Sequence, residues 1–146
     1  MLDGLFVAPA VTAVTEALRS ARADDGRLAV IGNAKLATAL AKPRDVIAVG
    51  LTARAAKKHP GALADLSSVE ASSLAGVIGV DVSVRDDWEA ALREWARVVR
   101  DGGVLVMLDR GRAAEASRRA LCAGLTELEQ RHAGRLVVTS GLVTHL

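Results

Sequence analysis

The sequence contains few of the residues that mark a disulfide framework or a base-stacking surface. It has one cysteine and three prolines, and its aromatic residues are one Phe and two Trp, with no Tyr. A single cysteine excludes a disulfide bond within the chain and favours a reducing compartment. Because aromatic residues are scarce, the core must be built from Val, Leu, Ile and Ala.

The sequence also has no block of like charge. Its 19 basic and 17 acidic residues are spread along the chain, with a formal net charge of +2, unlike a basic arm that binds nucleic acid. The first fourteen residues have no basic segment, and Asp3, Gly4 and Pro9 interrupt their apolar residues, which fits neither a secretory signal nor a membrane span. We expect a cytoplasmic protein with no membrane partner. The richness in Ala, Arg and Gly is typical of a GC-rich bacterial coding sequence.

A length of 146 residues, 51% of them hydrophobic, predicts a single domain over residues 1–146. The apolar periodicity alternates between helices and strands, which indicates a mainly parallel sheet covered on both faces. We predict helices over residues 11–23, 34–41, 53–58, 87–100 and 113–123. We predict seven strands, over residues 28–31, 45–50, 62–66, 77–82, 104–108, 126–130 and 136–143, the last two forming an antiparallel hairpin.

Several residues are expected to begin or end these helices. Asn33 and Thr52 are predicted N-caps, Pro43 is predicted to end the second helix, and Asp101-Gly102-Gly103 is predicted to end the fourth. Within the fourth helix, Trp88, Leu92, Trp95 and Val99 have the spacing of one core-facing side.

The segments 76–81, 86–94 and 96–106 resemble the second half of class I S-adenosylmethionine-dependent methyltransferases. In that family an acidic strand end is followed by a helix of this kind, a turn with two glycines and the fifth strand; Asp101 stands where the family turn has proline. The resemblance is strongest over residues 76–109 and extends weakly over nearly the whole chain. It implies an α/β, Rossmann-like doubly wound fold: a mostly parallel seven-stranded sheet with an antiparallel C-terminal hairpin.

The resemblance also implies where a cofactor would bind. The family carries an acid and a glycine-rich loop after the first strand, and a carboxylate for the ribose hydroxyls after the second. Here Val30 stands at the acidic position, Ala34 and Leu36 replace loop glycines, and Gly50 replaces the ribose carboxylate. Losing such a charge-assisted contact costs about 1.5–3 kcal/mol, which is about ten- to a hundred-fold in affinity. The candidate cofactor residues are Gly32, Asn33, Gly50 and Asp65, the last at the family's adenine position.

Other polar residues have both a functional and a structural interpretation. Asp81 and Asp109 follow two neighbouring strands and could perform acid/base chemistry or cap turns. The segment from Gly32 to Lys35 could hold an anion or simply begin a helix. The three histidines have no metal-ligand spacing, so no metal site is predicted, and Cys122 is expected to be a small buried residue.

Three functional hypotheses follow. The first is a pseudoenzyme without cofactor that acts as a protein-binding or assembly module, as a homodimer or with an unknown partner. The second is an active methyltransferase that holds S-adenosylmethionine through Asn33 and Asp65, with Asp81 near the methyl group. The third is a nucleic-acid-binding module, which would need the basic residues Arg110, Arg112, Arg118 and Arg119 to share one surface with Lys57 and Lys58. A cleft filled by Leu36 or its neighbours would favour the first hypothesis over the second.

Overall fold

The computed structural model describes residues 4–23, 25–42 and 44–145. Its centre is one sheet of six strands in the order β2-β1-β3-β4-β6-β5. The first four strands of this order are parallel, and β6 is antiparallel to both β4 and β5. In chain order the strands are β1 (Leu28–Ile31), β2 (Val46–Val49), β3 (Leu74–Val80), β4 (Val99–Arg110), β5 (Thr126–Ala133) and β6 (Leu136–Leu142).

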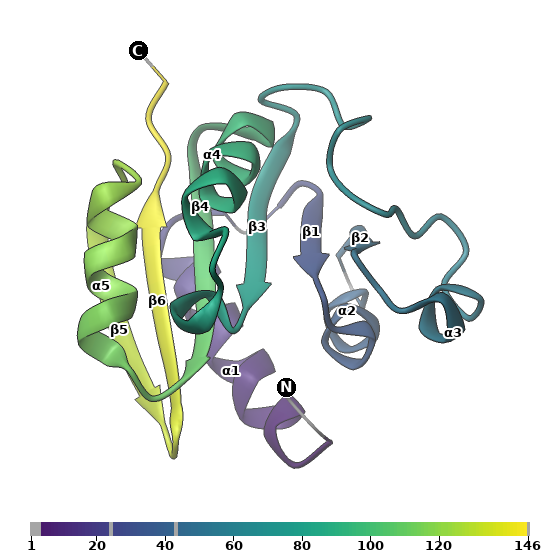
Figure 1. Ribbon diagram of the computed structural model, residues 1–146, viewed down its shortest axis with the longest axis horizontal. Helices are drawn as coiled ribbons and strands as arrows, with labels where there is room; N and C mark the ends of the chain where they lie inside the picture. Colours follow the sequence, from purple (N-terminus) through teal and green to yellow (C-terminus); the bar gives the residue numbers. More distant parts are fainter. Residues whose placement is uncertain (1–3, 24, 43, 146) are drawn as a thin grey trace.

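Helices cover both faces of the sheet (Figure 1). On one face lie α1 (Gly4–Ser20) and α2 (Ala34–Leu40), and on the other α4 (Trp88–Val98) and α5 (Ala113–Cys122). A short helix, α3 (Ala53–Ala56), follows β2, and a single 3-10 turn, η1 (Val82–Val84), follows β3. None of the helices in the described part of the chain is long and apolar enough to cross a membrane.

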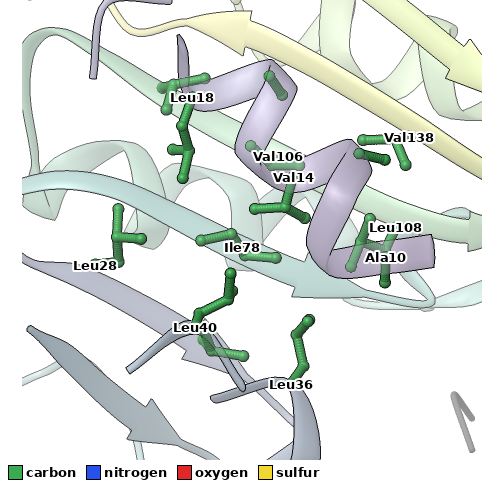
Figure 2. Close-up of a cluster of buried hydrophobic side chains, with 14 of the residues drawn as sticks. Ala10, Val14, Leu18, Leu28, Leu36, Leu40, Ile78, Val106, Leu108 and Val138 are labelled. Atoms are coloured by element: carbon green, nitrogen blue, oxygen red, sulfur yellow. The ribbon is translucent and has the colours of Figure 1, made fainter. Parts of the chain in front are cut away.

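The core consists of two apolar clusters, one on each face of the sheet. The first joins α1 and α2 to the sheet, and Figure 2 shows it with Val14, Leu36, Ile78 and Leu108 among its members. The second packs Leu92 and Trp95 of α4 on the opposite face. The central strands β1 and β3 are apolar on both faces, and the helices bury both faces, as is usual for parallel sheets. The α/β fold with its antiparallel C-terminal hairpin is therefore confirmed.

The sheet has six strands, so the prediction of seven is wrong. Of the predicted strand at residues 62–66, only Leu63 pairs with the sheet, through one bridge to Val49. Asp65 then turns the chain by accepting hydrogen bonds from Ser67. Arg97 of α4 donates to the carbonyl oxygens of Leu66 and Val69, which fixes the following coil outside the ladder.

The predicted end of the fourth helix is also wrong. α4 ends at Val98, and Val99 already has extended backbone angles and pairs with Leu74. The Asp101-Gly102-Gly103 segment lies inside β4, where the pairing shifts register between Leu74 and Gly76. Gly102 has a φ of +79°, which glycine adopts without strain. The glycines thus bulge a strand rather than end a helix. Pro43, predicted to end α2, lies outside the described residues.

Gly79 lets α4 approach β3 closely. A Cβ atom at this position would overlap the Trp95 ring, which is 4% exposed and packs in the second cluster. Within α4, Leu92 and Trp95 are buried and Trp88 is half-buried against the same cluster, as the predicted spacing requires. Val99 is also buried, but as the first residue of β4. Gly79 and Trp95 therefore set the distance between the helix and the sheet.

We predict that Gly79→Ala lowers the free energy of unfolding by about 1–3 kcal/mol, because the added methyl group overpacks this contact. Urea unfolding of the wild type, G79A, W95L and the double variant measures the effect. The smaller leucine side chain of W95L should relieve part of the strain, so the double variant should be more stable than the sum of the two single losses predicts. If the losses of unfolding free energy in G79A and W95L are strictly additive in the double variant, the contact between Gly79 and Trp95 does not set the distance between α4 and the sheet.

Candidate functional site

The carboxyl ends of β2, β1, β3 and β4 share one edge of the sheet. The chain runs from β1 to β2 in one direction and from β3 to β4 in the other, so the order of strands reverses between β1 and β3. Ligands of open α/β sheets bind at such a reversal. Gly32, Gly50 and Asp81 directly follow β1, β2 and β3, which places three of the predicted site positions on this edge.

The turn from β1 into α2 consists of only Gly32 and Asn33. The Asn33 side chain accepts a hydrogen bond of 2.8 Å from the backbone N–H of Leu36, so the predicted N-cap is confirmed. The helix therefore begins at Ala34, and the Leu36 side chain is fully buried beside Ile78 and Leu108 (Figure 2). Leu36 belongs to the core and does not fill a cleft at the edge of the sheet, so the filling by Leu36 that would have favoured the pseudoenzyme is not found.

The two glycines on this edge are open to solvent. Gly32 has a φ of +80° and Gly50 a φ of +68°, and no heavy atom lies within 4 Å of the position that a Cβ would take at Gly32. After Gly50 the chain enters α3, whose N-cap Thr52 accepts a hydrogen bond from the Ala55 N–H, as predicted. The segment between Gly50 and Lys58 carries no carboxylate.

Asp65 is exposed, and one of its carboxylate oxygens closes a local turn. Its Oδ1 accepts bonds from the backbone N–H and the hydroxyl of Ser67, at 2.9 and 2.6 Å. These bonds favour the ionised form and lower the pKa of Asp65. The carboxylate is thus held in a position set by its own turn.

Asp81 and Asp109 lie on neighbouring strands, as expected, but their environments differ. Asp81 has left-handed backbone angles, with a φ of 58°, and its N–H donates to the Leu108 carbonyl. Asp109 is 1% exposed; its Oδ1 accepts a 2.8 Å bond from the Ser83 N–H, and its Oδ2 is buried with no hydrogen-bond partner among the described residues. Burial raises the pKa of Asp109. The geometry gives Asp109 a turn-capping role.

Arg119 of α5 also binds the loop that follows β3, which Asp109 contacts through Ser83. Its guanidinium donates to the carbonyl oxygens of Val82 and Arg85, pairs with Glu115, and lies 5.1 Å from the Trp88 ring centroid. Arg118 also pairs with Glu115, and the two guanidinium groups lower the pKa of Glu115 to about 2. The loop after β3 is therefore clamped between β4 and α5. Sequence reasoning missed this role because the pattern of α5 shows only a charged helix face.

Basic residues gather at two separate places on the molecule. Arg110, Arg112, His132 and Arg135 line a recess between the start of α5 and the β5–β6 turn. Lys35, Arg54, Lys58 and His59 line a second cavity of about 580 Å³ between α2 and α3. The hypothesis of a nucleic-acid-binding module needs Lys57 and Lys58 on one surface with the arginines of α5, but α3 and α5 lie at opposite ends of the sheet (Figure 1). Gly32, Asn33, Gly50 and Asp65 are not among the residues lining the second cavity.

Two further residue types bear on chemistry. Cys122 is exposed at the end of α5, so the prediction that it is buried is wrong; the helix buries Ala116 and Ala120 and turns Cys122 outward. Within the described part of the chain, no three His, Cys, Asp or Glu side chains gather in a way that could hold a metal ion.

Comparison with known proteins bears on the fold. No family model and no curated protein sequence matches the chain, whereas several solved structures resemble it. An S-adenosylmethionine-dependent methyltransferase of Thermotoga maritima is 17% identical, with a TM-score of 0.68 over 95% of this chain and 92% of that chain. DesVI of Streptomyces venezuelae is 14% identical, with a TM-score of 0.70 over 95% of this chain and 92% of that one.

A third similar chain comes from the complex between the Haloferax volcanii Trm112 methyltransferase activator and its methyltransferase-like partner. It is 14% identical, with a TM-score of 0.67 over 97% of this chain and 96% of that chain. Likeness at these identities defines the fold: the chain has the Rossmann-like fold of class I S-adenosylmethionine-dependent methyltransferases.

We predict that Asp109→Asn changes how stability depends on pH. Because the native state raises the pKa of Asp109 above its ordinary value of 3.8, the native protein holds this proton more tightly than the unfolded chain. The wild type should therefore lose stability relative to D109N as the pH rises from 3.8 through the raised pKa. Urea unfolding at a series of pH values measures the difference.

The variant D86N controls for the removal of one negative charge, since Asp86 is exposed on the neighbouring loop. The side-chain amide of D109N retains an oxygen that can accept the Ser83 N–H, so the turn should persist. Parallel stability curves for D109N and the wild type over the whole pH series would contradict a buried, protonation-sensitive carboxyl at this position.

Proposed function

We propose that this chain is a methyltransferase-like domain that binds S-adenosylmethionine weakly or not at all and acts as a protein-binding or assembly module. The observation that carries the proposal is the turn between β1 and α2. Asn33 caps the helix at Ala34, and Leu36 is buried in the core. In a glycine-rich cofactor loop, the positions of Ala34 and Leu36 would be glycines outside the helix, because only glycine readily adopts positive φ beside a ligand.

The missing carboxylate after β2 supports the same proposal. Gly50 has no side-chain carboxylate to accept hydrogen bonds from ribose hydroxyl groups, and the next carboxylate along the chain, Asp65, already binds Ser67. A lost charge-assisted contact weakens binding about ten- to a hundred-fold. Both deficits act on one ligand, so their effects on affinity should multiply.

A protein partner fits the surface of the other half of the fold. Among the described residues, the large hydrophobic side chains that are well exposed are Val84, at 56%, and Leu121, at 63%. They belong to η1 and α5, the two elements that Arg119 joins. A similar chain occurs in a complex with a methyltransferase activator, so this fold is compatible with association. As part of this proposal, Val84 and Leu121 would also be the residues through which the chain forms a homodimer. We further propose that the protein is cytoplasmic.

An active S-adenosylmethionine-dependent methyltransferase is the second candidate. It is favoured by the open space at Gly32 and by a resembling structure that is itself such an enzyme. In this case Asn33 and Asp65 would contact the cofactor, and Asp81 would lie near the reacting methyl group. The left-handed backbone of Asp81 suits this role, since strained backbone positions often occur at functional sites.

Calorimetric titration with S-adenosylmethionine and S-adenosylhomocysteine separates the two candidates. The protein should first be refolded to remove any carried-over ligand. We predict no binding heat up to millimolar ligand, because Ala34 and Leu36 replace loop glycines and Gly50 replaces the ribose carboxylate. Micromolar binding would overturn the proposal and direct the search to methyl acceptors.

The variant D65N tests whether any binding of S-adenosylmethionine depends on the Asp65 carboxylate. If the chain is an enzyme that uses Asp65, D65N should weaken cofactor binding about ten-fold or more while leaving the fold intact, since Asp65 is exposed. If the proposal is right, the wild type and D65N should give the same flat titration.

A further inference from the structure

The cavity between α2 and α3 has the size and lining of a small-molecule site. Its volume of about 580 Å³ lies within the range of about 300–1,000 Å³ that is usual for ligand pockets. One wall comes from α2 and the other from the cap and body of α3 and the turn after it. The lining residues are Ala34, Lys35, Thr38, Ala39, Thr52, Arg54, Ala55, Lys58 and His59.

The charges around this cavity are of one sign. Lys35, Arg54 and Lys58 are basic, and no acidic residue belongs to the lining. Within the described chain none of these three side chains forms an ion pair, whereas Arg27, Arg97 and Arg118 each pair with a carboxylate. Cations gathered around a recess with apolar walls raise the local potential and attract anions.

Hydroxyl groups and apolar surface complete the lining. The Thr52 hydroxyl oxygen already accepts the Ala55 N–H, which leaves its O–H able to donate to a ligand. Thr38 donates to the Ala34 carbonyl, and its oxygen lies 3.5 Å from His59 Nε2. Ala34, Ala39 and Ala55 add small apolar side chains that leave room for an organic group.

We propose that this cavity binds a small phosphate ester. Lys35, Arg54 and Lys58 would hold the phosphate oxygens through charge-assisted hydrogen bonds, which arginine and lysine form readily with phosphate. The alanines would contact the organic body of the ligand. This site goes beyond the proposed function, because it needs neither S-adenosylmethionine nor a protein partner.

Titration at low ionic strength with pyrophosphate, ADP and uncharged adenosine tests the site. We expect sub-millimolar binding of ADP and pyrophosphate, and binding of adenosine at least ten-fold weaker. The double variant R54Q/K58Q should weaken ADP binding about ten- to a hundred-fold. The single variant K57Q is the matched control, because Lys57 is exposed on the same turn but does not line the cavity; it should bind ADP like the wild type.

Arg54 and Lys58 are exposed, so the variants should fold, which circular dichroism can verify. Absence of binding by pyrophosphate and ADP at ten-millimolar concentration would overturn the inference. Equal losses in K57Q and R54Q/K58Q would also overturn it, as would tighter binding of a single-stranded oligonucleotide than of ADP. The outcome is independent of the S-adenosylmethionine titration, so either proposal can fail while the other stands.

Discussion

The hydrogen bond from the Leu36 N–H to the Asn33 side chain decides how the first half of the chain is arranged. It fixes the first turn of α2 directly after β1, and an N-cap of this kind contributes about 0.5–2 kcal/mol. Once α2 begins there, Leu36 and Leu40 point into the cluster formed with α1 and the sheet. The same bond therefore places Leu36 in the core and holds Asn33 as the helix cap.

The second half of the fold is fixed by a different set of contacts. Gly79 admits Trp95 against β3, while Asp109 and Arg119 hold the loop after β3 from two sides. These contacts belong to packing and loop support, so the half of the chain that most resembles methyltransferases preserves the scaffold. The sequence of the first half differs from the family's cofactor motifs, although the similar structures cover 95% of the chain and so include both halves. The proposed function is therefore a binding role on a complete methyltransferase-like scaffold.

Much of this arrangement could be predicted from the sequence. Apolar runs and caps located β1, β2, α2 and the hairpin because burial and capping act locally. Residues 62–66 were misassigned because their apolar pattern does not reveal that Asp65 and Arg97 turn the chain away from the sheet. The start of β4 was missed because two glycines can end a helix or bulge a strand, and the choice depends on pairing with β3. The cavity between α2 and α3 was not predicted, since its cations come from separate segments.

The basic cavity and the edge of the sheet are adjacent but chemically different. The edge presents two open glycines with no carboxylate among residues 50–58, and the cavity beside it presents three cations. A ribose that needs a carboxylate to accept its hydroxyl hydrogen bonds has no such side chain at Gly50. An anionic ligand can instead pair with the three cations of the neighbouring cavity. We therefore expect this region of the molecule to bind an anionic ligand in the cavity more readily than a ribose at the edge of the sheet.

The most direct test of the central claim is a proton–nitrogen correlation spectrum of the labelled protein during titration with S-adenosylhomocysteine. The backbone N–H groups of Gly32 and Gly50 report on the edge where a methyltransferase cofactor would lie. We predict that both glycine signals stay in place up to millimolar ligand. Saturable shifts of both signals would show that the chain holds the cofactor despite its altered loop, and would contradict the claim that cofactor binding has been lost.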